Sequence, residues 1–120
     1  MPDVLSNWAA NAALQLILPT GCYLGCHLTD PTPMGNTGSE AAGGGYIRQL
    51  IGFADAANRT RVSINAQLFP GMPACTVTWL AVHTAISGGN IVFAKQLATP
   101  VPVLESGQFL VAAGDIALSL

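Results

Sequence analysis

The first segment of the chain is apolar and carries one narrow polar stripe. Within residues 3–18, DVLSNWAANAALQLIL, the polar side chains Asn7, Asn11 and Gln15 recur every four positions, and Pro19 follows. This spacing places the three side chains on one side of an α-helix that ends before the proline. Because the rest of the helix surface is apolar, we expect it to pack on its own sheet with one side and on a neighbouring subunit with another.

After the proline the pattern changes to short runs with strand character, separated by glycine, proline and other turn residues. Such runs with turn signals every 8 to 12 residues or so are typical of an all-β sandwich or jelly roll. The predicted fold class is mainly β: an antiparallel, jelly-roll-like β-sandwich with one N-terminal α-helix. The strands are expected at residues 22–28, 46–53, 61–69, 75–85, 90–97, 101–104, 108–113 and 115–120.

The organisation expected from this pattern is a single domain, residues 1–120, with the helix at 3–18 and the β-sandwich at 20–120. One long loop, residues 29–45, is the place where we expect contacts with other molecules. The segment SGGN at 87–90 supplies residues that tolerate positive φ between two strand-like runs, which predicts a β-hairpin.

Charge is scarce along the whole chain. Only 8% of the residues are charged and 51% are hydrophobic, against a usual charged share of roughly a quarter. Much of the surface must therefore be neutral, and we expect it to meet other protein. Four basic and six acidic residues give no electrostatic footprint for nucleic acid or an anionic membrane. No run reaches the roughly 18 to 20 apolar residues of a membrane span, and the first residues lack the basic charge of a secretory leader.

The glycine run in GSEAAGGGYIRQ raises the possibility of a phosphate-binding loop. Such a loop lies between a strand and a helix, and its Walker form also needs a lysine followed by serine or threonine. Here Gly43 to Gly45 precede an alternating, strand-like segment without a lysine. We expect these glycines to turn the long loop sharply into a strand, close to another backbone segment.

No arrangement typical of catalysis or metal binding is evident in the sequence. His27 and His83 lie inside strand-like runs, and the acid nearest to either in sequence is Asp30. The acids are scattered singly, without the paired carboxylates of acid–base catalysis or an HExxH motif. No serine lies in a G-x-S-x-G motif. We therefore expect structural histidines and a protein that is not an enzyme and has no cofactor or metal site.

The three cysteines are expected to be reduced thiols. Cys22 and Cys26 are four residues apart in a strand-like run, so they face one side about 13 Å apart, which is too far for a disulfide or a shared metal ion. Both are expected to be core residues. Cys75 begins a distant strand.

Three of the four basic residues are arginines, Arg48, Arg59 and Arg61. In a chain this poor in charge, they either pair with acids across a subunit contact or lie on a solvated face. The sequence leaves both alternatives open.

A series of motifs resembles a family of small tailed-phage virion proteins. In chain order they are VLSNWAANAALQLIL, GCYLGCHLTDPTP, GGGYIRQLIGF, LFPGMPACTVTWLAVHTAISGGNIVFAKQL and VPVLESGQFLVAAGDIALSL. The similarity covers nearly the whole chain. Because members of the family are described as tail-fibre-like or capsid-decorating proteins, the resemblance implies a β-sandwich assembly unit without catalysis.

Two hypotheses about function follow. The first is a capsid cement or decoration protein that binds the outer capsid surface and stabilises the shell, with the phage major capsid protein as its partner. The alternative is a tail, baseplate or fibre-associated module that contacts a host receptor. In either case we expect synthesis in the host cytoplasm, a place in the virion and a homo-oligomer. The family resemblance and the three-fold sites of a capsid favour a trimer. The candidate interface residues are Leu5, Trp8, Pro31, Pro33, Met34, Arg48, Arg59 and Arg61.

Overall fold

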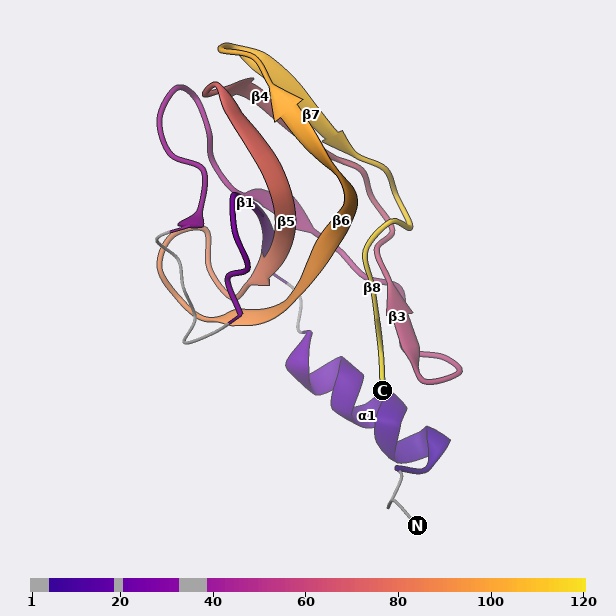
Figure 1. The fold of residues 1–120 in the computed structure, drawn as a ribbon. Helices are drawn as coiled ribbons and strands as arrows, with labels where there is room; N and C mark the ends of the chain where they lie inside the picture. The colour runs from indigo at the N-terminus through magenta and orange to yellow at the C-terminus, as the bar shows by residue number, and fades with distance from the viewer. Residues whose placement is uncertain (1–4, 19–20, 33–38) are drawn as a thin grey trace.

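The computed structural model describes residues 5–18, 21–32 and 39–120. In these residues one N-terminal helix, α1 (Asn7–Ile17), precedes a series of strands (Figure 1). The prediction of a mainly β fold with one N-terminal helix is confirmed. The strands are β1 (Cys22–His27), β2 (Gln49–Ile51), β3 (Thr60–Val62), β4 (Gln67–Met72), β5 (Cys75–His83), β6 (Ile91–Val103), β7 (Gly107–Val111) and β8 (Ala117–Ser119).

The strands pair in antiparallel fashion throughout the described residues. One sheet has four strands in the order β2-β1-β5-β6, and two further ladders join β3 to β8 and β4 to β7. Figure 1 shows α1 and the β3–β8 ladder at one end of the molecule and the turn between β6 and β7 at the other. These layers support the sandwich-like description, whereas the jelly-roll variant stays a prediction.

The core lies between the four-stranded sheet and the β4–β7 ladder. Cys22, Leu24 and Cys26 alternate along β1 and point into it, because successive side chains of a strand face opposite sides of the sheet. Across the core, Phe69 of β4 and Phe109 of β7 are directly paired, with ring centroids 6.1 Å apart. The predicted burial of the two β1 cysteines is confirmed, and no disulfide is present among the described residues.

Two predicted strand boundaries differ from the observed ones, because β6 lies at the edge of the sheet. The predicted strands 90–97 and 101–104 form one continuous strand that runs through Pro100 and Pro102. Proline lacks the N–H that a central strand must donate, but an edge strand can turn that position outward. The register shift between Val77 and Trp79 of β5 absorbs the irregularity. The predicted hairpin at 87–90 joins β5 to β6, with positive φ at Gly88 and Gly89.

The predicted strand 61–69 is divided into β3 and β4. The break begins at Ser63, whose hydroxyl accepts hydrogen bonds from the N–H groups of Gly114 and Ile116. These contacts tie the segment between the two strands to the chain before β8. The two parts of the predicted strand therefore pair with different partners, β8 and β7.

The predicted strand 46–53 is shortened to β2, because the edge of β1 beyond Leu24 is already occupied. Residues 39–41 pair there: the Leu28 N–H donates to the Ser39 carbonyl (2.8 Å), and the Ala41 N–H donates to the Cys26 carbonyl (2.9 Å). Residues 46–48 therefore approach the sheet without joining its ladder.

The glycine run turns the chain back beside the β4 strand, as predicted. The Gly45 N–H donates to the Gly71 carbonyl at 2.7 Å. Gly44 has φ +54°, and a Cβ atom there would lie 2.8 Å from the same carbonyl oxygen. Only glycine fits so close to another backbone.

Candidate functional site

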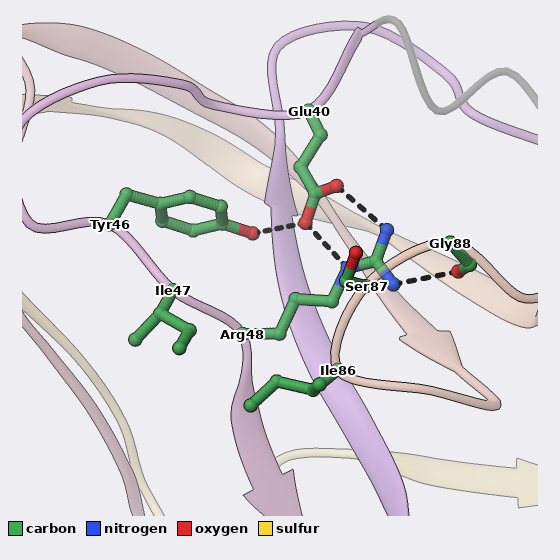
Figure 2. A pocket seen from close by; sticks show the side chains of 7 residues that line it. All are labelled: Glu40, Tyr46, Ile47, Arg48, Ile86, Ser87 and Gly88. Atoms are coloured by element: carbon green, nitrogen blue, oxygen red, sulfur yellow. Dashed lines mark hydrogen bonds and ion pairs between the residues drawn. The ribbon is translucent and has the colours of Figure 1, made fainter.

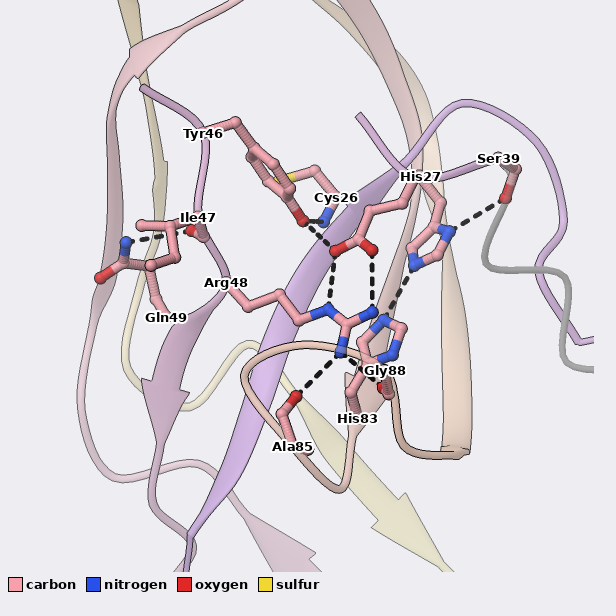
Figure 3. A network of polar contacts seen from close by, with 11 residues as sticks. Cys26, His27, Ser39, Tyr46, Ile47, Arg48, Gln49, His83, Ala85 and Gly88 are labelled. Carbon is pink, nitrogen blue, oxygen red and sulfur yellow. Dashed lines mark hydrogen bonds and ion pairs between the residues drawn. The ribbon is translucent and has the colours of Figure 1, made fainter. Parts of the chain in front are cut away.

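Two features outside the hydrophobic core are candidates for a functional site. One is a buried polar cluster on the second face of the sheet, and the other is an exposed apolar face of α1. The polar cluster consists of His27, Ser39, Glu40, Tyr46, Arg48 and His83 (Figure 3). It joins β1, the end of β5 and the part of the long loop that crosses the sheet. This cluster was not predicted from the sequence, because its residues come from segments far apart in the chain.

A small residue in β1 makes room for the cluster. Gly25 lies opposite Ala81 of β5 on the face away from the core. A Cβ atom at Gly25 would lie 2.9 Å from Glu40 Oε2, 3.0 Å from His83 Nε2 and 3.1 Å from the Tyr46 hydroxyl. The polar side chains therefore occupy the space that a larger residue would fill.

Glu40 and Arg48 form the charged centre of the cluster (Figure 2). Arg48 Nε donates to Glu40 Oε2 and Nη2 donates to Oε1, both at 2.8 Å. The Tyr46 hydroxyl donates to the same Oε2 at 2.5 Å and accepts from the Cys26 N–H at 3.0 Å. Burial raises the pKa of Glu40, but the bonds from Arg48 and Tyr46 outweigh it, so the pKa lies below its usual value.

The remaining donors of Arg48 hold the β5–β6 hairpin. Arg48 Nη1 donates to the carbonyl oxygens of Ala85 at 2.8 Å and Gly88 at 2.9 Å. The Arg48 guanidinium therefore links the loop that crosses the sheet to the β5–β6 hairpin beside it. The adjoining pocket of about 340 Å³ is lined by Glu40, Tyr46, Ile47, Arg48, Ile86, Ser87 and Gly88 (Figure 2).

The two histidines stack against each other beside the ion pair. Their ring centroids are 5.2 Å apart, and the two Nε2 atoms lie 3.0 Å apart, so one must carry the shared proton and the other accept it. His27 Nδ1 lies 2.9 Å from Ser39 Oγ, whereas His83 Nδ1 has no hydrogen-bond partner among the described residues. Both rings are fully buried. Burial lowers the pKa of both, and Arg48 helps to lower that of His83 to about 4.

The cluster also brings a carboxylate to the histidines, which the sequence did not reveal. His27, Glu40 and His83 offer ligand atoms within 4.8 Å of one another. Both carboxylate oxygens already accept bonds from Arg48, and a guanidinium so close opposes a bound cation. The geometry therefore favours a shared-proton pair that fastens the loop to the sheet.

The second feature is the outward side of α1. Ser6 caps the helix by accepting from the Ala9 N–H at 3.1 Å. Ala10 and Leu14 form the buried side of the helix, and two residues of the predicted polar stripe bond to the protein beside it: the Ala56 N–H donates to Gln15 Oε1 at 2.6 Å, and the Arg59 N–H donates to Asn11 Oδ1 at 2.9 Å. Apolar side chains are left pointing outward, with Trp8 exposed by 81% and Leu16 by 80%.

Apart from the arginines, the candidate interface residues fall into three groups. Leu5 and Trp8 are exposed, whereas Pro31 is buried; Pro33 and Met34 lie outside the described residues. Their part in an interface stays a prediction.

The arginines are engaged within the chain itself. Arg48 and Arg61 are each only 6% exposed. Arg61 donates to the carbonyl oxygens of Leu18, Phe53 and Ala54, and its Cζ lies 5.7 Å from the centre of the Phe53 ring. A mostly apolar pocket of about 410 Å³ adjoins it, lined by Leu18, Gly21, Leu50, Ile51, Gly52, Phe53, Arg61, Ile64 and Asn65.

Arg59 binds the two ends of the described chain together. Its guanidinium donates to the carbonyl oxygens of Leu5 and Leu120, the latter at 2.6 Å from Nε. Arg59 thus has intrachain contacts that account for its side chain. These contacts could not be predicted from the sequence, because the partners lie far away in the chain.

Comparison with known proteins identifies a family. No curated protein matches the chain, and none of the described helices is long and apolar enough to cross a membrane. The family described as podophage GP4 fiber I protein gp80 matches residues 3–119. Because this match spans nearly the whole chain and agrees with the mainly β fold, the protein belongs to the podophage GP4 fiber I protein gp80 family, a family of tailed-phage virion structural proteins.

Proposed function

We propose that this chain is a non-catalytic, homo-oligomeric structural subunit of a fibre on the phage virion. The observation that carries the proposal is the uncharged outer face of α1, where Trp8 and Leu16 are each about four-fifths exposed. A lone subunit gains nothing from such a surface, whereas a subunit of an assembly buries it. The description of the matched family as a fiber protein supports the fibre over other parts of the virion.

The state of the polar cluster supports an architectural role. Glu40 accepts bonds from Arg48 and Tyr46, and both histidines are fully buried. An ion pair whose acid is already bonded in this way, beside histidines closed to solvent, fastens a loop, whereas acid–base catalysis needs a free group within reach of a substrate. The net charge of −2 likewise favours protein partners over nucleic acid or an anionic membrane.

A capsid cement protein is the second candidate. It is favoured by Leu104, which is 81% exposed in the turn between β6 and β7, at the opposite end of the molecule from α1 (Figure 1). An apolar contact at each end would let one copy bridge two neighbours on a shell. In that role the partner is the major capsid protein, and the place is the outer capsid surface.

Quantitative mass spectrometry of purified particles separates the two candidates. The measurement is the ratio of this protein to the major capsid protein, together with its distribution between isolated capsids and tails. A few copies that fractionate with tails or fibres support the fibre subunit. Hundreds of copies on capsids establish the cement role instead, and absence from the particles overturns both.

A further inference from the structure

Arg61 is a buried cation without an acidic partner. It is 6% exposed, the same as Arg48. Arg48 is paired at two points with the Glu40 carboxylate, whereas no acid of the described residues forms an ion pair with Arg61. Arg61 instead donates to three backbone carbonyl groups, which are neutral. Because buried charges in proteins are generally paired, the Arg61 side chain lacks the counter-charge that Arg48 has.

Two hydrogen-bond donors of Arg61 also remain available. A guanidinium carries five N–H groups. In Arg61 the Nε, Nη1 and Nη2 atoms each donate to one carbonyl oxygen, which leaves one N–H on each terminal nitrogen without a partner among the described residues. A carboxylate matches this pair in charge and in its two oxygens. A phosphate brings more negative charge and more acceptors than one arginine balances.

The cavity beside Arg61 is apolar apart from two side chains. Its volume is about 410 Å³, which lies in the range of small-molecule sites. Arg61 and Asn65 are the polar side chains of its lining, and the other lining residues are apolar or glycine, among them Leu50, Phe53 and Ile64. A ligand that fills this cavity therefore needs one anionic group and an apolar body.

Asn65 closes the edge of β2 beside the cavity. The Gly52 N–H donates to Asn65 Oδ1 at 2.8 Å, and Asn65 Nδ2 donates to the Leu50 carbonyl at 3.2 Å. The Gly52 carbonyl accepts from the Ile64 N–H at 3.0 Å. A partner strand needs such backbone groups to pair with an edge, and here they are already bonded. This arrangement favours a small ligand over an extended peptide.

We propose that this cavity binds a small amphiphilic monocarboxylate, of the chemical class of a medium-chain fatty acid. The carboxylate accepts from the two remaining N–H groups of Arg61, and the alkyl chain packs against the apolar lining, including Leu50 and Ile64. The ligand thereby supplies the counter-charge that the fold does not. This site is separate from the α1 surface on which the proposed function rests, so either proposal can fail while the other stands.

Isothermal titration calorimetry of the full chain with sodium octanoate tests the proposal. At neutral pH octanoate is ionised and should bind one per chain. It should bind at least about tenfold more tightly than 1-octanol, which offers the same chain without the charge. Octylammonium should not bind, because its cation meets the Arg61 guanidinium. Acetate should not bind measurably either, because it lacks the apolar chain.

A matched pair of variants locates the site. Ile64 and Ile47 are exposed by 62% and 50%, but only Ile64 lines this cavity. Ile64→Glu places a second carboxylate at the cavity and should weaken octanoate binding at least about tenfold. Ile47→Glu adds the same charge to the chain elsewhere and should leave the affinity unchanged. These exposed positions are preferred to Arg61, whose replacement also removes three hydrogen bonds of the fold.

Several outcomes overturn the proposal. No binding of octanoate at millimolar concentration refutes the site. Equal affinity for octanoate and octanol shows that Arg61 does not receive the carboxylate, and equal affinity in Ile64→Glu and Ile47→Glu shows that binding occurs elsewhere on the protein. If the capped peptide Leu-Glu-Leu binds and octanoate does not, the cavity receives an acidic side chain of a neighbouring protein instead of a free amphiphile.

Discussion

Arg48 and Glu40 form a two-point ion pair, with both nitrogen–oxygen distances at 2.8 Å, beneath the loop that crosses the second face of the sheet. The Arg48 side chain is 5% exposed and that of Glu40 is 14% exposed. The pair connects three segments, because Arg48 also binds the β5–β6 hairpin. The long loop is therefore anchored by charge on a face of the sheet where the core cannot hold it.

Removing Arg48 should destabilise the fold strongly. In Arg48→Met the Glu40 carboxylate is left largely buried without its counter-charge, which costs about 3 to 5 kcal/mol in comparable pairs. Urea unfolding should show this loss, and the double variant Arg48→Met, Glu40→Leu should recover part of it. Glu105→Gln, at an exposed position, is the control and should change stability by less than about 0.5 kcal/mol. Equal effects in Arg48→Met and the control would contradict the anchoring role.

Gly25→Ala should be destabilising by about 1 to 3 kcal/mol, because its Cβ atom meets three polar atoms at 3.1 Å or less. Glu40 and Tyr46 cannot move aside without giving up their mutual hydrogen bond. Gly52→Ala is the matched control, since the nearest atoms to its Cβ lie at 3.4 Å or more. Thermal unfolding of the two variants should differ by several degrees, and a Gly25→Ala protein as stable as the unchanged chain would show that the cluster is loose.

The fold should lose stability as the pH falls from about 6.5 to 4. Burial, with Arg48 beside it, lowers the pKa of His83 to about 4 from its ordinary 6.5, and burial also lowers that of His27. In this window the unfolded chain binds protons that the folded chain does not. The free energy of unfolding therefore decreases as the pH falls. The His83 contribution is on the order of 2 to 3 kcal/mol. Glu40 extends the loss below its ordinary pKa of 4.5, because its own pKa is lowered too.

His83→Gln checks the origin of this pH dependence. The variant lacks the titrating ring but keeps a side-chain amide near the His27 ring. Unfolding midpoints measured at intervals between pH 7 and 4 should fall less steeply than in the unchanged chain. An identical slope would show that the acid sensitivity arises elsewhere.

The features predicted correctly from the sequence are those that local patterns control. The polar spacing of Asn7, Asn11 and Gln15 predicts α1, and the glycines at 88 and 89 predict the hairpin, since each depends on a few neighbouring residues. The close backbone approach at Gly44 follows in the same way. Such features need no knowledge of the rest of the fold.

The polar cluster could not be predicted because it depends on strand register. His27 and Glu40 are bridged across an irregular edge of β1, and His83 reaches them only through the β1–β5 pairing. The sequence pointed to Asp30 as the nearest acid, but its carboxylate binds Thr32. The sequence also did not show that Asn11 and Gln15 accept hydrogen bonds from the chain itself, because polar residues in a helix usually face water.

The thiols should differ in reactivity in the folded protein. Cys75 is partly exposed, whereas Cys22 and Cys26 are buried in the core. Burial raises the pKa of all three, so each reacts slowly at neutral pH, and Cys26 is the most enclosed. An aromatic disulfide reagent should modify Cys75 first, and Cys75→Ser should remove that fast phase. After unfolding in denaturant without reductant, three thiols should be titrated; a smaller number would reveal a disulfide.

Arg59 offers a way to separate backbone strain from side-chain contact. It follows Asn58 in a tight turn in which both residues have positive φ, 50° and 64°. A residue with a side chain pays about 1 kcal/mol or more for this conformation, whereas glycine does not. Its guanidinium meanwhile holds the carbonyl groups of Leu5 and Leu120. Two opposing effects therefore meet in one residue.

Both Arg59→Ala and Arg59→Gly lose the guanidinium bonds, but only the glycine variant relieves the turn. Arg59→Ala should therefore be the less stable of the two by about 1 kcal/mol. In both, amide hydrogen exchange should quicken in α1 and β8 more than in β5, because the bonds that tie the ends of the described chain together are gone. Asn58→Gly controls for the turn alone. If Arg59→Ala changes the oligomer mass while exchange in α1 stays slow, Arg59 acts between subunits, as the sequence had left open, and its intrachain bonds are secondary.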